Sequence, residues 1–195
     1  MSRVSLEHCT WCKLSKTRTQ VVQGAGSLDS KLLFIAESPG RFEDMSGLPF
    51  QGSMTKDIYD AILDALDLDR ESVWTTYVCK CRASDETPFG RRKNRPPDVE
   101  EVEACADWLN LEIETVEPKL IITLGATALH RITGLAGMNN HRGRYISLPG
   151  KPFRIFPIYH PAFIAYHKNE QSIIDTVKDD LENLKKGIDK CLKRN

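Results

Sequence analysis

Short apolar segments recur along the chain, and each has the length and composition of a buried β-strand. They are rich in β-branched and aromatic residues and are bounded by polar residues, glycine or proline. The predicted strands span Leu32 to Ala36, Val73 to Val78, Lys119 to Leu124 and Phe153 to Ile158. The first of them leads into a polar stretch that ends at Gly52 and is expected to place Glu43 and Asp44 in a loop.

Apolar residues at intervals of three and four predict the helices between these strands. The expected helices run from Ser53 to Leu66, with Ser53 as N-cap, from Asp98 to about Glu114, from Ala126 to Thr133 and from Gln171 to Lys190. The polar segments 83–97 and 134–152 are predicted to be loops.

Strands that alternate with helices indicate an α/β fold, a three-layer αβα arrangement with a short, mainly parallel central sheet. We expect residues 1–195 to form a single domain. The loop after the first strand and the Tyr159-His160-Pro161 loop after the last both follow carboxyl ends of strands. Ligands bind at that edge of open α/β sheets, so the two loops are predicted to face one cleft.

Composition narrows the function classes. The formal net charge is zero, so no global basic field marks a nucleic-acid binder. Basic residues cluster locally instead, between Arg82 and Arg95 and at Arg142 and Arg144. The sequence shows no secretory signal and no apolar run of the roughly 20 residues that a membrane span needs. The expectation is a soluble, intracellular (cytoplasmic) monomer.

Four of the six cysteines suggest a metal centre. Cys9 and Cys12 form a CxxC pair, Cys81 follows a predicted strand, and Cys105 lies in a predicted helix. Four thiolates from three segments suit either a zinc ion or a [4Fe–4S] cluster. Cys79 shares a face with Cys81 only if the strand continues that far, and otherwise is a core residue.

A second group of residues carries the chemistry of a cleft. Its members are polar or aromatic: Glu37, Glu43, Asp44, Phe50, Asn94 and His160. A carboxylate can position water, a histidine can donate a hydrogen bond to a developing anion, and an aromatic ring can stack on a base. Each also has a structural alternative, as a surface acid, a satisfied histidine or a core ring. His8, His130 and His167 are assigned to that structural class.

These motifs together resemble the family 4 uracil-DNA glycosylases, the iron–sulfur branch of the uracil glycosylase superfamily. The resemblance runs from Cys9 to about Leu184. It rests on motifs in a fixed order: Cys9-x-x-Cys12-x-Leu14, LLFIAESPGRFED, Gly47-Leu-Pro-Phe50-Gln-Gly52, Lys80-Cys81-Arg82, Asn94-Arg95-x-Pro97, Cys105, LIITLGATAL, Arg142-Gly143 and Tyr159-His160-Pro161-Ala162.

The resemblance implies a role for each matching residue. Glu43 corresponds to the acid that positions water, and Phe50 to the ring that stacks on the uracil. His160 corresponds to the histidine that bonds uracil O2, and Asn94 to a polar active-site residue. Glu37 and Tyr77 are expected to contact the substrate, and Arg142 and Gly143 are expected to contact the backbone and minor groove of the substrate DNA. The [4Fe–4S] ligands correspond to Cys9, Cys12, Cys81 and Cys105.

The chain departs from the family at four places. Ala36 stands where the family usually has glycine, and Ser53-Met54 replace a glycine-containing turn. Tyr77 stands where the family carries an asparagine that reads the uracil edge, and the segment between Cys81 and Cys105 is lengthened by the basic residues Arg91, Arg92 and Lys93. The prediction is excision of uracil from single- or double-stranded DNA by hydrolysis of the N-glycosidic bond. The alternative is a non-catalytic iron–sulfur DNA-binding protein of the same fold.

Overall fold

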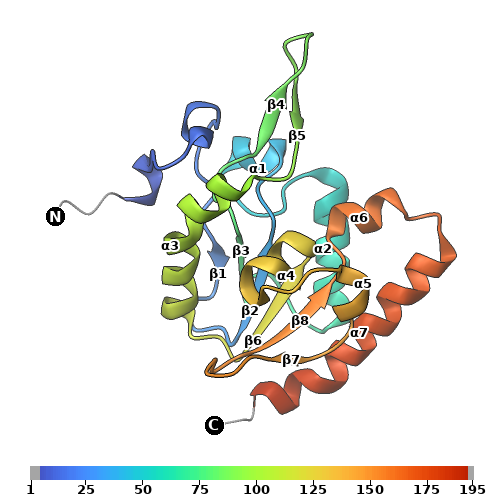
Figure 1. Cartoon of the computed structure of the whole chain (residues 1–195). Helices are drawn as coiled ribbons and strands as arrows, with labels where there is room; N and C mark the ends of the chain where they lie inside the picture. The colour runs from blue at the N-terminus through green and yellow to red at the C-terminus, as the bar shows by residue number, and fades with distance from the viewer. Residues whose placement is uncertain (1–4, 193–195) are drawn as a thin grey trace.

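The computed structural model describes residues 5–192 and is built on a six-stranded sheet of order β1-β3-β2-β6-β8-β7 (Figure 1). The inner strands are parallel to one another: β2 (Leu32–Ala36), β3 (Trp74–Tyr77), β6 (Leu120–Leu124) and β8 (Arg154–Ile158). Two short antiparallel strands, β1 (Ala25–Gly26) and β7 (Ile146–Ser147), form the edges. The predicted mainly parallel α/β sheet is therefore confirmed.

Strand β2 marks the point where the direction of winding reverses. Strand β3 pairs with one side of β2, and β6 pairs with the other. The connections that leave the carboxyl ends of β2 and β6 therefore diverge, which opens a crevice there.

Helices pack on both faces of the sheet. One face holds α2 (Ser53–Ala65), α6 (Pro161–Tyr166) and α7 (Gln171–Leu192), and the other holds α3 (Val99–Val116) and α4 (Ala126–Thr133). All five residues of β2 are buried. Alternation along the strand sends Phe34 to the α2 and α7 side and Leu33 and Ile35 to the α3 and α4 side.

The four main strands and the four long helices lie where they were predicted, with ends shifted by a few residues. Helix α3 begins with a full capping box: the Asp98 carboxylate accepts from the Glu101 N–H (3.0 Å), and the Glu101 side chain accepts from the Asp98 N–H (2.9 Å). Gly52, not the predicted Ser53, occupies the N-cap position of α2.

Three segments predicted as loops contain regular structure. Residues 83–97 form a hairpin of β4 (Ser84–Glu86) and β5 (Arg92–Asn94), and residues 134–152 contain α5 (Met138–His141) and β7. Glu43 and Asp44 lie in a short helix, α1 (Arg41–Ser46), which ends at Gly47. These elements are too short or too polar to produce a hydrophobic period. Short 3-10 turns, Leu6–His8 and Lys13–Lys16, precede the sheet.

No helix within residues 5–192 is long and apolar enough to cross a bilayer.

Candidate active site and cysteine pocket

A cleft of about 670 Å³ opens at the carboxyl ends of the parallel strands. Of the seven residues predicted to contact substrate, six line it: Glu37, Glu43, Phe50, Tyr77, Asn94 and His160. Arg142 does not line this cleft. Its guanidinium group pairs with Asp180 (2.5 Å) and lies over the Tyr159 ring.

Glu43 is held in the cleft by the chain that follows it. Its carboxylate is 5% exposed, and Oε1 accepts the N–H groups of Gln51 (2.8 Å) and Gly52 (2.9 Å). These two bonds fix the plane of the carboxylate, so Oε2 remains available to a ligand. A Cβ at Gly40 would lie 2.6 Å from Oε2, so only glycine leaves room beside this oxygen.

Asn94 at the end of β5 is oriented by Arg82. The Arg82 Nε–H donates to Asn94 Oδ1 (2.7 Å), which leaves the amide Nδ2 as the free donor. The point beside Gly40 that lies 2.6 Å from Glu43 Oε2 also lies 3.4 Å from Asn94 Nδ2. That point is one bond length from the Gly40 Cα and so cannot itself hold a ligand, but it shows that an acceptor and a donor lie on the same wall of the cleft, where a water molecule can bridge them.

The Phe50 ring forms an aromatic floor of the cleft, and both its backbone and its ring are held in place by neighbouring side chains. Its backbone adopts φ of 50°, in the left-handed region. Arg70 holds that conformation by donating to the carbonyls of Pro49 and Phe50, both at 3.0 Å. The Tyr59 ring stacks on the Phe50 ring with centroids 4.2 Å apart and planes inclined by 14°.

Tyr77 ends β3 directly beside this floor. It is 2% exposed, and its hydroxyl oxygen accepts the Phe50 N–H (3.0 Å). Burial raises the pKa of the phenol, so the hydroxyl keeps its proton. Because the N–H occupies one side of the oxygen, the O–H bond is directed away from Phe50.

His160 lies between β8 and α6 and caps that helix. Its Nδ1 accepts the Ala162 N–H (3.0 Å), which assigns the ring proton to Nε2. Burial lowers the pKa of His160 to about 4, so the ring is neutral at pH 7. Gly125, at φ of 90°, lets the chain pass close to this ring, because a Cβ there would lie 3.1 Å from the His160 Cβ.

Glu37 faces the same cleft from the end of β2. The Thr127 hydroxyl at the start of α4 donates to its Oε2. Its carboxylate is therefore connected to the loop after β6, on the opposite side of the crevice.

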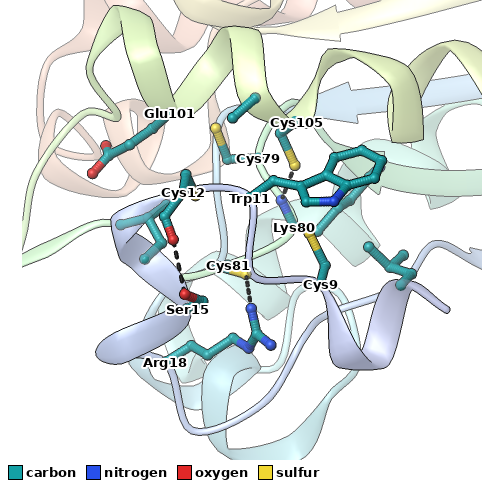
Figure 2. Close-up of a pocket in the computed structure, with 13 residues that line it drawn as sticks. Cys9, Trp11, Cys12, Ser15, Arg18, Cys79, Lys80, Cys81, Glu101 and Cys105 are labelled. Carbon is teal, nitrogen blue, oxygen red and sulfur yellow. Dashed lines mark hydrogen bonds between the residues drawn. The ribbon is translucent and has the colours of Figure 1, made fainter. Parts of the chain in front are cut away.

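The cysteines line a separate, smaller pocket between the N-terminal segment, the loop after β3 and helix α3. Cys9, Cys12, Cys79, Cys81 and Cys105 contribute to its wall, together with Leu6, Trp11 and Leu14 (Figure 2). The Arg18 guanidinium donates to the Cys81 sulfur (3.4 Å), and the Lys80 backbone N–H donates to the Cys105 sulfur (3.3 Å). Donors of this kind stabilise thiolates.

The pKa values of these thiols diverge. Burial raises the pKa of Cys12, and it raises that of Cys81 to about 11 despite Arg18. Hydrogen bonds from Cys79 and from the Lys80 N–H lower the pKa of Cys105. Residues 5–192 contain no group of three or more His, Cys, Asp or Glu side chains placed to hold a metal ion, so the ligand set stays a prediction.

Three residues that support the cleft were not predicted from the sequence. Arg70 fixes the Phe50 backbone, Arg82 orients Asn94, and Thr127 bonds Glu37. Arg82 directly follows the predicted ligand Cys81, so its position in the sequence could have indicated a role near the site. Arg70 and Thr127 carry no local pattern, because their partners lie 20 and 90 residues away in the sequence.

A sequence model of the uracil DNA glycosylase superfamily matches residues 23–182. The chain belongs to the uracil DNA glycosylase superfamily. Type-4 uracil-DNA glycosylases are among its relatives: that of Thermotoga maritima is 34% identical, over 95% of this chain and 92% of that protein. The type-4 enzyme of Sulfurisphaera tokodaii is also 34% identical, over 86% of this chain and 76% of its own length.

The fold is also found in a solved structure, the crystal structure of Pedobacter heparinus SMUG2. It superposes with a TM-score of 0.54 at 18% identity, over 80% of this chain and 76% of that chain.

Proposed function

We propose that this protein is a DNA glycosylase that excises uracil by hydrolysing its N-glycosidic bond. The proposal rests on one observation: a neutral histidine with a free Nε2–H and a carboxylate with a free Oε2 face the same cleft above an aromatic floor. Relatives more than 30% identical along most of this chain are named type-4 uracil-DNA glycosylases, which supports it.

A uracil must leave the base stack to enter this cleft, at a cost of a few kcal/mol. Phe50, backed by Tyr59, offers the flat surface on which a flipped base can stack. Because Arg70 and Tyr59 hold this ring in place before the substrate arrives, no ordering cost is added on binding.

The reaction adds water across the bond between the sugar C1′ and uracil N1. As that bond breaks, its electron pair moves onto the uracil ring, and the sugar becomes cationic. We assign His160 Nε2–H as the donor to uracil O2, where the negative charge accumulates. A neutral donor suits this step because it stabilises the anion and keeps its own proton.

The attacking water is assigned to the part of the cleft that Glu43 Oε2 and Asn94 Nδ2 border. Glu43 accepts the water proton as the new C1′–O bond forms, and uracil N1 takes up a proton when the base leaves. The negative carboxylate also stabilises the cationic sugar.

Tyr77 is assigned to base selection. Its oxygen already accepts from the Phe50 N–H, so its O–H can donate toward the cleft but is poorly placed to accept there. A base with a carbonyl group at this edge, such as uracil, accepts that bond. Cytosine presents an amino group instead and would leave two donors facing each other.

Cys9, Cys12, Cys81 and Cys105 are assigned to a [4Fe–4S] cluster. All four line one pocket, three of them are buried, and Arg18 and Lys80 donate to two of the sulfurs. Where burial raises the pKa of the thiols, bound metal supplies the positive charge that lets them ionise. The cluster would join the N-terminal segment to α3 and leave Cys79 as a neighbouring core thiol.

Single-turnover release of uracil from a single-stranded oligonucleotide tests the function. Removing one preorganised donor slows such reactions by about a hundred- to a thousandfold, so H160A should fall in that range. E43Q should slow release by about a hundredfold or more, because loss of a general base typically costs that much. The exposed residues His130 and Glu103 provide matched controls, H130A and E103Q.

Two results would contradict the proposal. One is DNA binding by the wild-type protein without uracil release, together with a gain of activity in Tyr77→Asn. That outcome favours the alternative, a non-catalytic DNA-binding protein. The other is a loss of activity in the control variants as large as in H160A and E43Q, which would indicate general instability.

A further inference from the structure

The β4–β5 hairpin extends from the body of the protein near the cleft (Figure 1). Its strands pair from Ser84 with Asn94 to Glu86 with Arg92. The root residue Asn94 lines the cleft, whereas the tip, residues 87–91, is far from the sheet. The hairpin therefore connects the predicted catalytic site to a surface beyond it.

The tip is an ordered turn that presents an aromatic ring to solvent. The Thr87 N–H donates to the Arg91 carbonyl (2.6 Å), and the Gly90 N–H donates to the Thr87 carbonyl (2.9 Å). Phe89 lies at the crest and is 90% exposed, more than any other large hydrophobic side chain in residues 5–192. An exposed phenylalanine on an ordered turn gains no folding energy from burial, so its ring is free to contact a ligand.

The charges around Phe89 are those of a nucleic-acid surface. Arg91, at the end of the turn, and Lys93, on β5, are exposed. The hairpin also carries two acids: Asp85 pairs with Arg95 (2.9 Å), whereas Glu86 is exposed and lies opposite Arg92 in the strand register. An aromatic ring beside free cations is the combination that binds the bases and phosphates of single strands.

The root of the hairpin is rigid. Arg82 donates to the Asn94 side chain (2.7 Å) and to the Arg92 carbonyl (3.1 Å), and Arg92 donates to the Thr17 carbonyl. These bonds connect β5 both to the cleft and to the N-terminal segment. The direction of the hairpin relative to the cleft is consequently fixed.

We propose that this hairpin is a DNA-contact arm in which Phe89 stacks on an unpaired base while Arg91 and Lys93 contact phosphates. The inference rests on the proposed function, because it takes DNA as the substrate. Five residues at about 3.3 Å each would place Phe89 at most about 16 Å from Asn94, since residues 89–91 belong to the turn. That reach equals about five stacked nucleotides at roughly 3.4 Å.

The test measures affinity, separately from uracil release. The probe is a fluorescent single strand with one 2′-fluorinated deoxyuridine, whose fluorine slows breakage of the glycosidic bond and keeps the base in the cleft. With ten nucleotides on each side, F89A should bind roughly five- to a hundredfold more weakly than wild type, the range of one base–aromatic stack. F89W should retain affinity.

Leu111→Ala is the matched control, because it removes an exposed apolar side chain (53% exposed) from the C-terminal half of α3. The flanks of the strand are then shortened one side at a time. On the side that reaches Phe89, the difference in affinity between F89A and wild type should disappear once fewer than about four nucleotides remain. The proposed DNA-contact arm is contradicted if F89A binds the long strand as tightly as wild type does. It is also contradicted if F89A still binds more weakly than wild type when both flanks are removed. Absence of uracil release by wild type would instead contradict the proposed function.

Discussion

At the scale of single residues, the cleft depends on which atoms remain available after the protein's own hydrogen bonds are made. The Ala162 N–H donates to Nδ1 of His160, and Arg82 donates to Oδ1 of Asn94. The N–H groups of Gln51 and Gly52 donate to Oε1 of Glu43. What remains is one donor at the leaving base and an acceptor and a donor at the water position. Polar side chains with one satisfied atom and one free atom are preorganised for binding.

The half-buried His160 should leave a signature in stability. Its pKa is lowered to about 4 in the folded protein, from about 6.5 in the unfolded chain. Between these values the unfolded chain binds more protons, so stability is fully present above about pH 6.5 and is lost as the pH falls toward 4. Between pH 8 and pH 5, wild type should lose about 2 kcal/mol more unfolding free energy than H160Q.

Denaturant unfolding at the two pH values measures that difference. H130Q is the control, because His130 is exposed on α4, and it should lose as much stability as wild type. If H160Q and wild type respond equally to pH, the imidazole is not buried in its neutral form, and the assigned Nε2–H donor is wrong.

Residue types and motif order were enough to predict that Glu43, Phe50, Asn94 and His160 share one cleft. Carboxyl ends of parallel strands meet at one edge, and Glu43 and His160 follow the parallel strands β2 and β8, whereas Asn94 ends β5 of the separate hairpin. Their orientation was beyond the sequence, because it depends on partners such as Arg82 and Ala162. Arg142 lies outside the cleft with its guanidinium against Asp180, and its predicted contact with the DNA backbone stays a prediction.

At the scale of elements, the long strands and helices were predictable because burial imposes a period on their sequences. Strand β2 is apolar at every position, and the amphipathic helix α7 was predicted almost to its ends. The hairpin and α1 were not. The hairpin is polar on both sides, and α1 buries two acids, Glu43 and Asp44, through hydrogen bonds to distant backbone.

The hairpin's structure changes the expectation for its basic residues. Of the inserted cations, Arg92 already donates to the Thr17 carbonyl, whereas Arg91 and Lys93 are exposed. Each phosphate contact contributes about 0.9 to the slope of log affinity against log salt. Replacing Arg91 and Lys93 with glutamine should therefore reduce that slope by about two units.

Anisotropy titrations of duplex DNA from 50 to 200 mM salt give the slopes. The double replacement of Lys178 and Lys186 with glutamine is the matched control, since both lysines are exposed on α7. A slope that the hairpin variant leaves unchanged would mean that Arg91 and Lys93 only solvate the hairpin.

At the scale of the whole molecule, one segment connects the cleft and the cysteine pocket twice. The chain leaves the cleft at Tyr77, passes Cys79 and Cys81 in the pocket, and returns to the cleft at Asn94. It then enters the pocket again at Cys105. A cluster bound by both Cys81 and Cys105 would therefore close a loop of the chain that contains Arg82 and Asn94.

This connectivity makes the predicted cluster part of the fold that supports the active site. Purified protein should be brown and contain about four irons per chain. C81A should lose the iron and most of its soluble yield, because thiolate ligation contributes directly to folding energy. C79A should keep the iron, since that thiol is expected to be a core residue, and C191A is the control, because Cys191 is a buried thiol of α7 away from the cysteine pocket. Iron analysis of anaerobically purified protein measures the outcome. One zinc per chain without iron would contradict the assignment of an iron–sulfur cluster. Loss of iron in C79A but not in C81A would show that Cys79, and not Cys81, is the ligand.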